Sequence, residues 1–279
     1  MAALPDIFPK IIELPSGLKL EGCLTPPSPV TELDEERGVA RLPGKRLAVC
    51  LHPWARLGGS MNDPVLQALV HPLTHYLKFH VLRYNARGVG RSSGWKSFTG
   101  LQEGEDLREL VQYALKRLSD VRQVAFIGYS NGALTASLHP VLPAHIRTAH
   151  VLISYPLGPR GLLTAFRTGT YQCALEDLIR QPAARVLMCY GDADDFTSAD
   201  AYEEWTEALG KLAVGTEEGG GREEMPQQGA GVGEVDQDES GTGEQGGSGL
   251  EVVRIPQATH FWGGHAGSGL IEAVTQFLT

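Results

Sequence analysis

Two kinds of hydrophobic pattern alternate along most of this chain. Short, nearly continuous apolar runs occupy residues 46–53, 79–85, 123–130, 148–155, 184–191 and 250–257. Continuous apolar character is typical of strands that are covered on both faces, as in parallel sheets. We therefore predict six core strands at these positions.

Helical spacing of apolar residues fills the intervals between these runs. The clearest example is 103–118, where Leu107, Leu110, Val111 and Leu118 belong to a series with intervals of three and four residues. Further helices are predicted at 64–77, 131–139, 198–210 and 267–279. Regular alternation of strand and helix predicts an α/β fold with a mostly parallel central sheet and helices on both faces.

Two segments depart from this alternation. The N-terminal stretch IFPKIIELPSGLKLEGCLTPP predicts a β-hairpin that turns at Ser16-Gly17. Residues 215–249 are rich in Gly, Glu and Gln and contain no aromatic residue. Such a segment buries little apolar surface, so we predict a disordered insertion in a single domain that spans 1–279. A tolerated surface loop is one interpretation, and an acidic docking segment for a basic protein partner is the other.

Charge and composition narrow the possible functions. The chain has 33 acidic and 24 basic residues. Nine of the acids and one of the bases lie in 215–249, which leaves 24 acids and 23 bases for the rest. This nearly neutral remainder lacks the basic field that nucleic-acid binding needs. The chain has no apolar run long enough for a membrane span, no secretory-signal pattern and four scattered cysteines, which favours a cytoplasmic location.

The candidate chemistry lies at the predicted strand ends, where open α/β sheets bind their ligands. The apolar run 123–130 ends within Gly128-Tyr129-Ser130-Asn131-Gly132. This G-x-S-x-G sequence lies at the junction of a predicted strand and a predicted helix. That context predicts a nucleophile elbow with Ser130 exposed above the sheet. Two later strand ends offer acids and histidines: Asp192, Asp194, Asp195, His260 and His265. The chain order serine, acid, histidine is the one found in α/β-hydrolases.

Five segments together resemble the α/β-hydrolase superfamily: LHPWARLGGSMN, LRYNARGVGRSSG, GYSNG, YGDADDF and THFW. They span roughly 46–279 and are most similar to small intracellular serine hydrolases of the dienelactone-hydrolase-like branch. Dienelactone hydrolases use a cysteine nucleophile, so Ser130 argues against that substrate. Serine in place of aspartate likewise argues against a dehalogenase or epoxide hydrolase.

The resemblance implies Asp194 as the acid, because in this family the acid stands three residues after the glycine that closes its strand. It implies His260 as the base, because the family's histidine opens the loop after the last strand. Two backbone N–H groups are needed for an oxyanion hole, and Asn131 follows the nucleophile. The second is assigned to Trp54, since Pro53 has no N–H.

These residues predict a serine esterase or thioesterase that acts on a small acyl substrate through an acyl-enzyme, without a cofactor or a metal. An acyltransferase with the same triad, or a non-catalytic scaffold on this fold, are the alternatives. Only 156–183 separate the strand at 148–155 from the acid strand, so we expect a minimal cap of one or two short helices. Its apolar wall would come from Leu162, Leu163, Phe166 and Leu178, unless these residues serve ordinary packing.

Three motifs are set aside. RGVGRSSG at 87–94 misses the spacing of a dinucleotide-binding loop and is interpreted as the turn after a strand. HPLTH at 71–75 lacks the glutamate of a zinc-protease motif, so His71 and His75 are expected on a helix face. HFWGGH has no further ligands clustered with it in the sequence.

Overall fold

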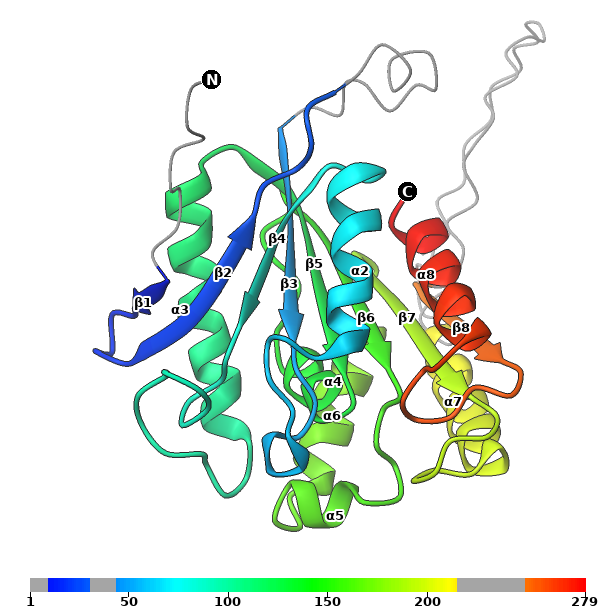
Figure 1. Cartoon of the computed structure of the whole chain (residues 1–279). Helices are drawn as coiled ribbons and strands as arrows, with labels where there is room; N and C mark the ends of the chain where they lie inside the picture. Colours follow the sequence, from blue (N-terminus) through cyan, green and yellow to red (C-terminus); the bar gives the residue numbers. More distant parts are fainter. Residues whose placement is uncertain (1–9, 31–43, 215–248) are drawn as a thin grey trace, which may run out of the picture.

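The computed structural model describes residues 10–30, 44–214 and 249–279 (Figure 1). The insertion predicted at 215–249 lies outside these ranges except for its last residue. Its disorder, its role as a partner site and the single-domain assignment therefore stay predictions.

The described strands form one eight-stranded sheet in the order β1-β2-β4-β3-β5-β6-β7-β8. The strands are β1 (Ile11–Glu13), β2 (Lys19–Thr25), β3 (Lys45–Leu51), β4 (Phe79–Tyr84), β5 (Val121–Tyr129), β6 (Arg147–Ile153), β7 (Ala184–Gly191) and β8 (Leu250–Ile255). From β4 to β8 all neighbours are parallel. The predicted N-terminal hairpin is confirmed, because β1 and β2 pair antiparallel with Ile12 opposite Leu20.

Helices cover both faces of this sheet, as predicted. The helical elements are η1 (Ala55–Leu57), α2 (Pro64–His75), α3 (Leu101–Leu118), α4 (Asn131–Ser137), α5 (Arg160–Leu163), α6 (Thr168–Ile179), α7 (Ala199–Val214) and α8 (His265–Leu278). Helices α2 and α8 lie side by side on one face, and α3, α4, α6 and α7 pack on the other (Figure 1). The central strands β3 to β7 are therefore buried on both sides, which explains their continuous apolar runs. The edge strand β8 differs, because none of its residues is buried.

All six predicted core strands and all five predicted helices are present, but five of the strands end one or two residues earlier than predicted. The residues beyond each end, such as His52-Pro53 and Ser154-Tyr155, leave the sheet and build the connections at its carboxyl edge.

Within the described ranges, no helix combines the length and the apolar character that crossing a bilayer requires.

Candidate active site

Ser130 sits on a sharp turn between β5 and α4. Its φ is 53°, a left-handed backbone conformation that is uncommon for a residue with a side chain. A Cβ on Gly132 would lie 2.2 Å from the Leu51 carbonyl oxygen, and one on Gly128 would lie 2.4 Å from the Gly132 carbonyl oxygen. The two glycines of the motif therefore allow the helix to start directly against the neighbouring strands, and the serine side chain is left at the edge of the sheet.

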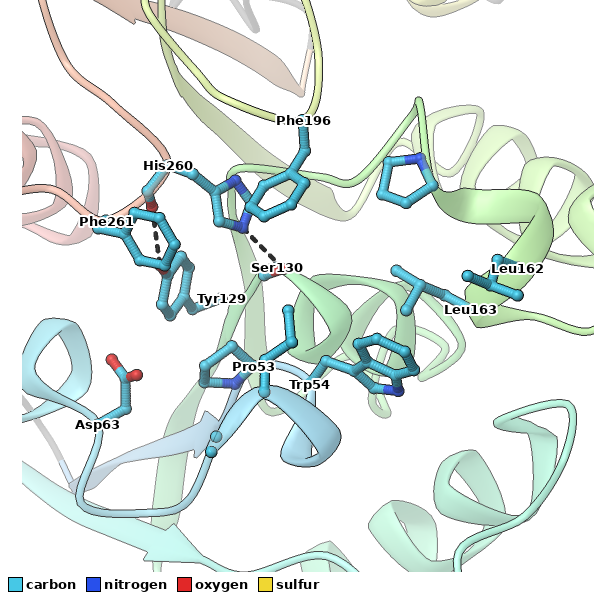
Figure 2. Close-up of a pocket in the computed structure, with 14 residues that line it drawn as sticks. Pro53, Trp54, Asp63, Tyr129, Ser130, Leu162, Leu163, Phe196, His260 and Phe261 are labelled. Atoms are coloured by element: carbon cyan, nitrogen blue, oxygen red, sulfur yellow. Dashed lines mark hydrogen bonds between the residues drawn. The ribbon is translucent and has the colours of Figure 1, made fainter.

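Ser130, His260 and Asp194 form a continuous hydrogen-bonded chain. His260 Nε2 lies 2.9 Å from Ser130 Oγ (Figure 2). His260 Nδ1 lies 2.7 Å from Asp194 Oδ2. The other oxygen of Asp194 accepts hydrogen bonds from the N–H groups of Phe196 and Thr197, at 2.8 and 3.1 Å. The Asp194 side chain is completely buried, so this carboxylate is fixed in the orientation that faces the imidazole.

The other candidate acids and the other histidine lie elsewhere. Asp192 Oδ1 accepts a hydrogen bond from the Gln257 N–H at 2.6 Å, and its second oxygen pairs with Arg254. Asp195 is exposed, and His265 is an exposed residue in the first turn of α8. Of the residues considered from the sequence, the structure brings together the three that the family resemblance implied.

The two backbone amides considered for an oxyanion hole belong to Trp54, in the loop after β3, and to Asn131, which directly follows Ser130. Among the described residues, no acceptor pairs with the amide of Trp54 or with that of Asn131. Asn131 is the first residue of α4, where amides have no partner within the helix. These are the two donors expected from the sequence for an oxyanion hole.

The orientation of the Trp54 amide is set by a neighbour that the sequence analysis missed. The Ala86 N–H donates to His52 Nε2 at 3.1 Å, so the proton of the neutral ring is on Nδ1. Nδ1 then donates to the Pro53 carbonyl oxygen at 2.7 Å. Because C=O and N–H point in opposite directions in a trans peptide, this bond fixes the Trp54 N–H on the opposite side. Burial lowers the pKa of His52, which keeps the ring neutral.

The loop that carries Trp54 closes tightly on itself. The Gly59 N–H donates to the Trp54 carbonyl at 3.2 Å, and a Cβ on Gly59 would lie 2.2 Å from the Pro53 oxygen. Further along, the Met61 N–H donates to Asn85 Oδ1 at 2.8 Å. The peptide between Pro53 and Trp54 is thus held from several directions.

A cavity of about 370 Å³ opens beside Ser130. Trp54, Leu162 and Leu163 lie on one side of the serine, and Asp63, Tyr129 and Phe261 lie on the other (Figure 2). The lining is mainly apolar, which suits the hydrocarbon part of a small ligand.

No protein-family model matches this sequence, and no curated protein does so either. Solved structures match over almost the whole chain. A serine hydrolase without a lid from Xanthomonas campestris has 22% identity and a TM-score of 0.58, with 95% of this chain and 92% of that chain covered. Est1E from Butyrivibrio proteoclasticus, solved with bound ferulic acid, has 19% identity, a TM-score of 0.61 and 96% of both chains covered. An esterase from Pyrococcus furiosus has 16% identity and a TM-score of 0.62, with 96% of this chain and 88% of that chain covered.

The chain has the α/β-hydrolase fold. The cap of this fold is small, as predicted, because the connection between β6 and β7 contains only α5 and α6. Of the four residues considered for its apolar wall, Leu162 and Leu163 line the cavity. Leu178 is buried in the core instead, and Phe166 is exposed away from the cavity lining, so ordinary packing accounts for Leu178.

Tyr129 and Phe196 are cavity residues of this α/β-hydrolase fold that the sequence analysis did not single out. The Tyr129 hydroxyl donates to the His260 carbonyl oxygen at 2.7 Å, and burial raises the pKa of the phenol. The Phe196 ring meets the His260 ring edge to face, with centroids 4.7 Å apart. Tyr129 stands inside the G-x-S-x-G motif, but nothing in the sequence shows that its side chain reaches the histidine loop.

Two of the motifs that were set aside, HPLTH and RGVGRSSG, lie outside the cavity, whereas His260 and Phe261 of HFWGGH line it. His71 and His75 stack on each other along α2, with ring centroids 4.6 Å apart. Residues 87–94 form the turn region after β4. The described part of the chain contains no group of three or more His, Cys, Asp or Glu side chains that could hold a metal ion.

Proposed function

We propose that this protein is a serine hydrolase that cleaves a carboxylic ester or thioester through an acyl-enzyme. The observation that carries the proposal is the chain of hydrogen bonds from Ser130 Oγ through His260 to the buried Asp194. A serine hydroxyl is a weak nucleophile unless a base in hydrogen-bond contact removes its proton as it attacks. The distances of 2.9 and 2.7 Å satisfy that requirement.

In the proposed reaction, His260 Nε2 takes the Ser130 proton while Oγ attacks the acyl carbon. Asp194 holds the proton on Nδ1 and stabilises the imidazolium that forms. The imidazolium then gives its proton to the leaving alcohol or thiol. Water, activated by the same His260, attacks the acyl-enzyme and releases the acid, which restores Ser130.

We assign the stabilisation of the tetrahedral oxyanion to the amides of Trp54 and Asn131. Both are free to donate within the described chain, and they come from the two loops that supply such donors in this fold. The bond from His52 to Pro53 supports this assignment, because it fixes the direction of the Trp54 N–H before substrate arrives.

The cavity favours a small acyl substrate with an apolar part. Trp54, Leu162 and Leu163 offer hydrocarbon contacts on one side of Ser130 (Figure 2). The compared protein from Pyrococcus furiosus is an esterase, and Est1E holds ferulic acid. Both support ester hydrolysis at the level of the fold.

Labelling with a fluorophosphonate tests the proposal. The wild-type protein should form a covalent adduct on Ser130 and hydrolyse p-nitrophenyl acetate, and Ser130→Ala should lose both. Ser137→Ala is a matched control, because Ser137 is a buried serine of α4 that does not line the cavity. A folded wild-type protein without an adduct contradicts the proposal, and so does hydrolysis that survives in Ser130→Ala.

A further inference from the structure

The carboxyl edge of the sheet gathers the most exposed apolar side chains of the described protein. Six large apolar residues are between 64% and 89% exposed, more than any other within the described ranges: Leu57, Trp95, Phe98, Leu162, Phe166 and Phe261. We call these six the apolar rim. All of them lie on η1, on α5 or on connections that follow the ends of β4, β6 and β8, at the lower edge of Figure 1. Apolar patches of this kind mark interaction surfaces.

A substrate in the cavity accounts for only half of the apolar rim. Leu57, Leu162 and Phe261 belong to the cavity lining, whereas Trp95, Phe98 and Phe166 do not. Trp95 and Phe98 are on the connection between β4 and α3, beyond the cavity wall. A ligand beside Ser130 therefore leaves Trp95, Phe98 and Phe166 uncovered.

Positive charge accompanies the apolar rim. Three rim residues have an exposed basic neighbour in the chain: Arg56 before Leu57, Lys96 after Trp95, and Arg167 after Phe166. Among the described residues, none of these three cations forms an ion pair. Arg56, Trp95 and Lys96 also line one shallow groove, so two cations accompany the most exposed apolar ring among the described residues.

Exposed charge is distributed unevenly along this edge. The connection from β4 to α3, residues 85–100, contains three bases and no acid. The exposed acid Asp195 follows β7, which is separated from β4 in the sheet by β3, β5 and β6. Of the three bases in 85–100, Arg87 is paired with Asp106, and the half-buried Glu103 accepts hydrogen bonds from Ser97. The exposed charged residues around Trp95 are therefore the bases Arg56, Arg91 and Lys96.

We propose that the apolar rim docks on a lipid surface that contains anionic headgroups. Trp95 and Phe98 enter the interfacial layer, where aromatic side chains are favoured, and Arg56 and Lys96 contact the headgroups. A protein partner seated on the rim would cover the mouth of the cavity. A lipid surface covers Trp95, Phe98 and Phe166 and also brings acyl groups to that mouth. Docking goes beyond the proposed reaction, because it is a binding property that does not depend on Ser130.

Sedimentation of the full chain with phospholipid vesicles tests this inference. We expect binding to phosphatidylcholine vesicles that contain phosphatidylserine, weaker binding to pure phosphatidylcholine, and a decrease as salt is raised. The double variant Trp95→Ala/Phe98→Ala should lower the partition coefficient by on the order of tenfold or more, because it removes two large apolar groups from the contact. Arg56→Glu/Lys96→Glu should remove the preference for phosphatidylserine. Tyr76→Ala is the matched control, because this 52% exposed ring caps α2 and lies outside the rim.

Three results would overturn the inference. If the wild-type protein sediments with neither vesicle type, the rim does not dock on lipid, and a protein partner becomes its occupant instead. If Trp95→Ala/Phe98→Ala binds vesicles as well as the wild type does, the aromatic side chains do not contact the lipid. If the wild type binds both vesicle types equally, the anionic headgroups do not contribute to binding. Failure here leaves the hydrolase proposal standing, and failure of fluorophosphonate labelling leaves docking standing, so the two proposals are judged separately.

Discussion

Gly59→Ala tests whether the loop before α2 (residues 53–63) prepares the Trp54 amide for catalysis. The new Cβ would lie 2.2 Å from the Pro53 oxygen and 2.6 Å from the Pro53 carbonyl carbon. Real Cβ atoms do not approach backbone that closely, so either this peptide or the Gly59 backbone must move. The Pro53 oxygen is also the acceptor of the His52 bond, and a shift would break or redirect it. The Trp54 N–H turns with the same peptide plane.

The expected effect is the loss of one oxyanion donor. Such a loss costs roughly 2.7–4 kcal/mol of transition-state stabilisation, or about 10²–10³ in kcat. KM should change much less, because the donor acts mainly on the tetrahedral intermediate. Overpacking costs about 1–3 kcal/mol of folding free energy, so the variant should remain folded at moderate temperature.

The assay is steady-state hydrolysis of p-nitrophenyl acetate, with unfolding followed by circular dichroism. Gly169→Ala is the control, because a Cβ on this glycine of α6 meets nothing within 4 Å. If Gly59→Ala keeps a kcat within a few-fold of wild type, the Trp54 amide is not the second oxyanion donor. If Gly169→Ala loses as much activity as Gly59→Ala, the effect is not local to the loop.

Three further changes test other parts of the fold. Asp194→Asn should keep the fold and lower kcat by on the order of 10⁴, because the amide no longer holds the productive His260 tautomer; a loss below tenfold would contradict this role. Asp63 accepts a hydrogen bond from the Val65 N–H at 2.9 Å, so Asp63→Ala should destabilise the protein by about 1 kcal/mol in urea unfolding, whereas Asp63→Asn, which can still cap α2, should not. Burial lowers the pKa of His139 to about 4 and that of His150 to about 3, so both stay neutral in the fold while the unfolded chain binds protons below about 6.5. Stability should therefore be complete above about pH 6.5 and fall as the pH is lowered towards 3, and urea midpoints that are flat from pH 7 to pH 4 would refute this.

The sequence predicts the scaffold well because local patterns determine it. Continuous apolar runs and helical spacing require only neighbouring residues, and every strand and helix predicted from them is present. The candidate triad follows in part from chain order and in part from resemblance. Periodicity alone leaves Asp192, Asp194 and Asp195 equivalent, and only the fold shows that Asp192 is bound to Gln257.

The contacts that the sequence does not reveal are those between distant segments. The Tyr129 hydroxyl meets the carbonyl of a residue 131 positions away, and the His52 ring is oriented by Ala86. All four residues belong to segments that resemble the family, but no segment shows which other segment it contacts. These bonds therefore become visible only when strands far apart in the chain are adjacent. The same is true of the apolar rim, whose members come from separate connections.

The connection between α7 and β8 leaves and re-enters the described fold at the edge opposite to the candidate site. Helix α7 ends at Val214, and β8 starts at Leu250 beside the first residues of β7, whereas Ser130 and His260 follow the far ends of their strands (Figure 1). Chain length between these two points can therefore vary during evolution without altering the distance from nucleophile to base. For the same reason, this position is a practical place to insert a fluorescent label or a fused domain while the chemistry at the other edge is measured.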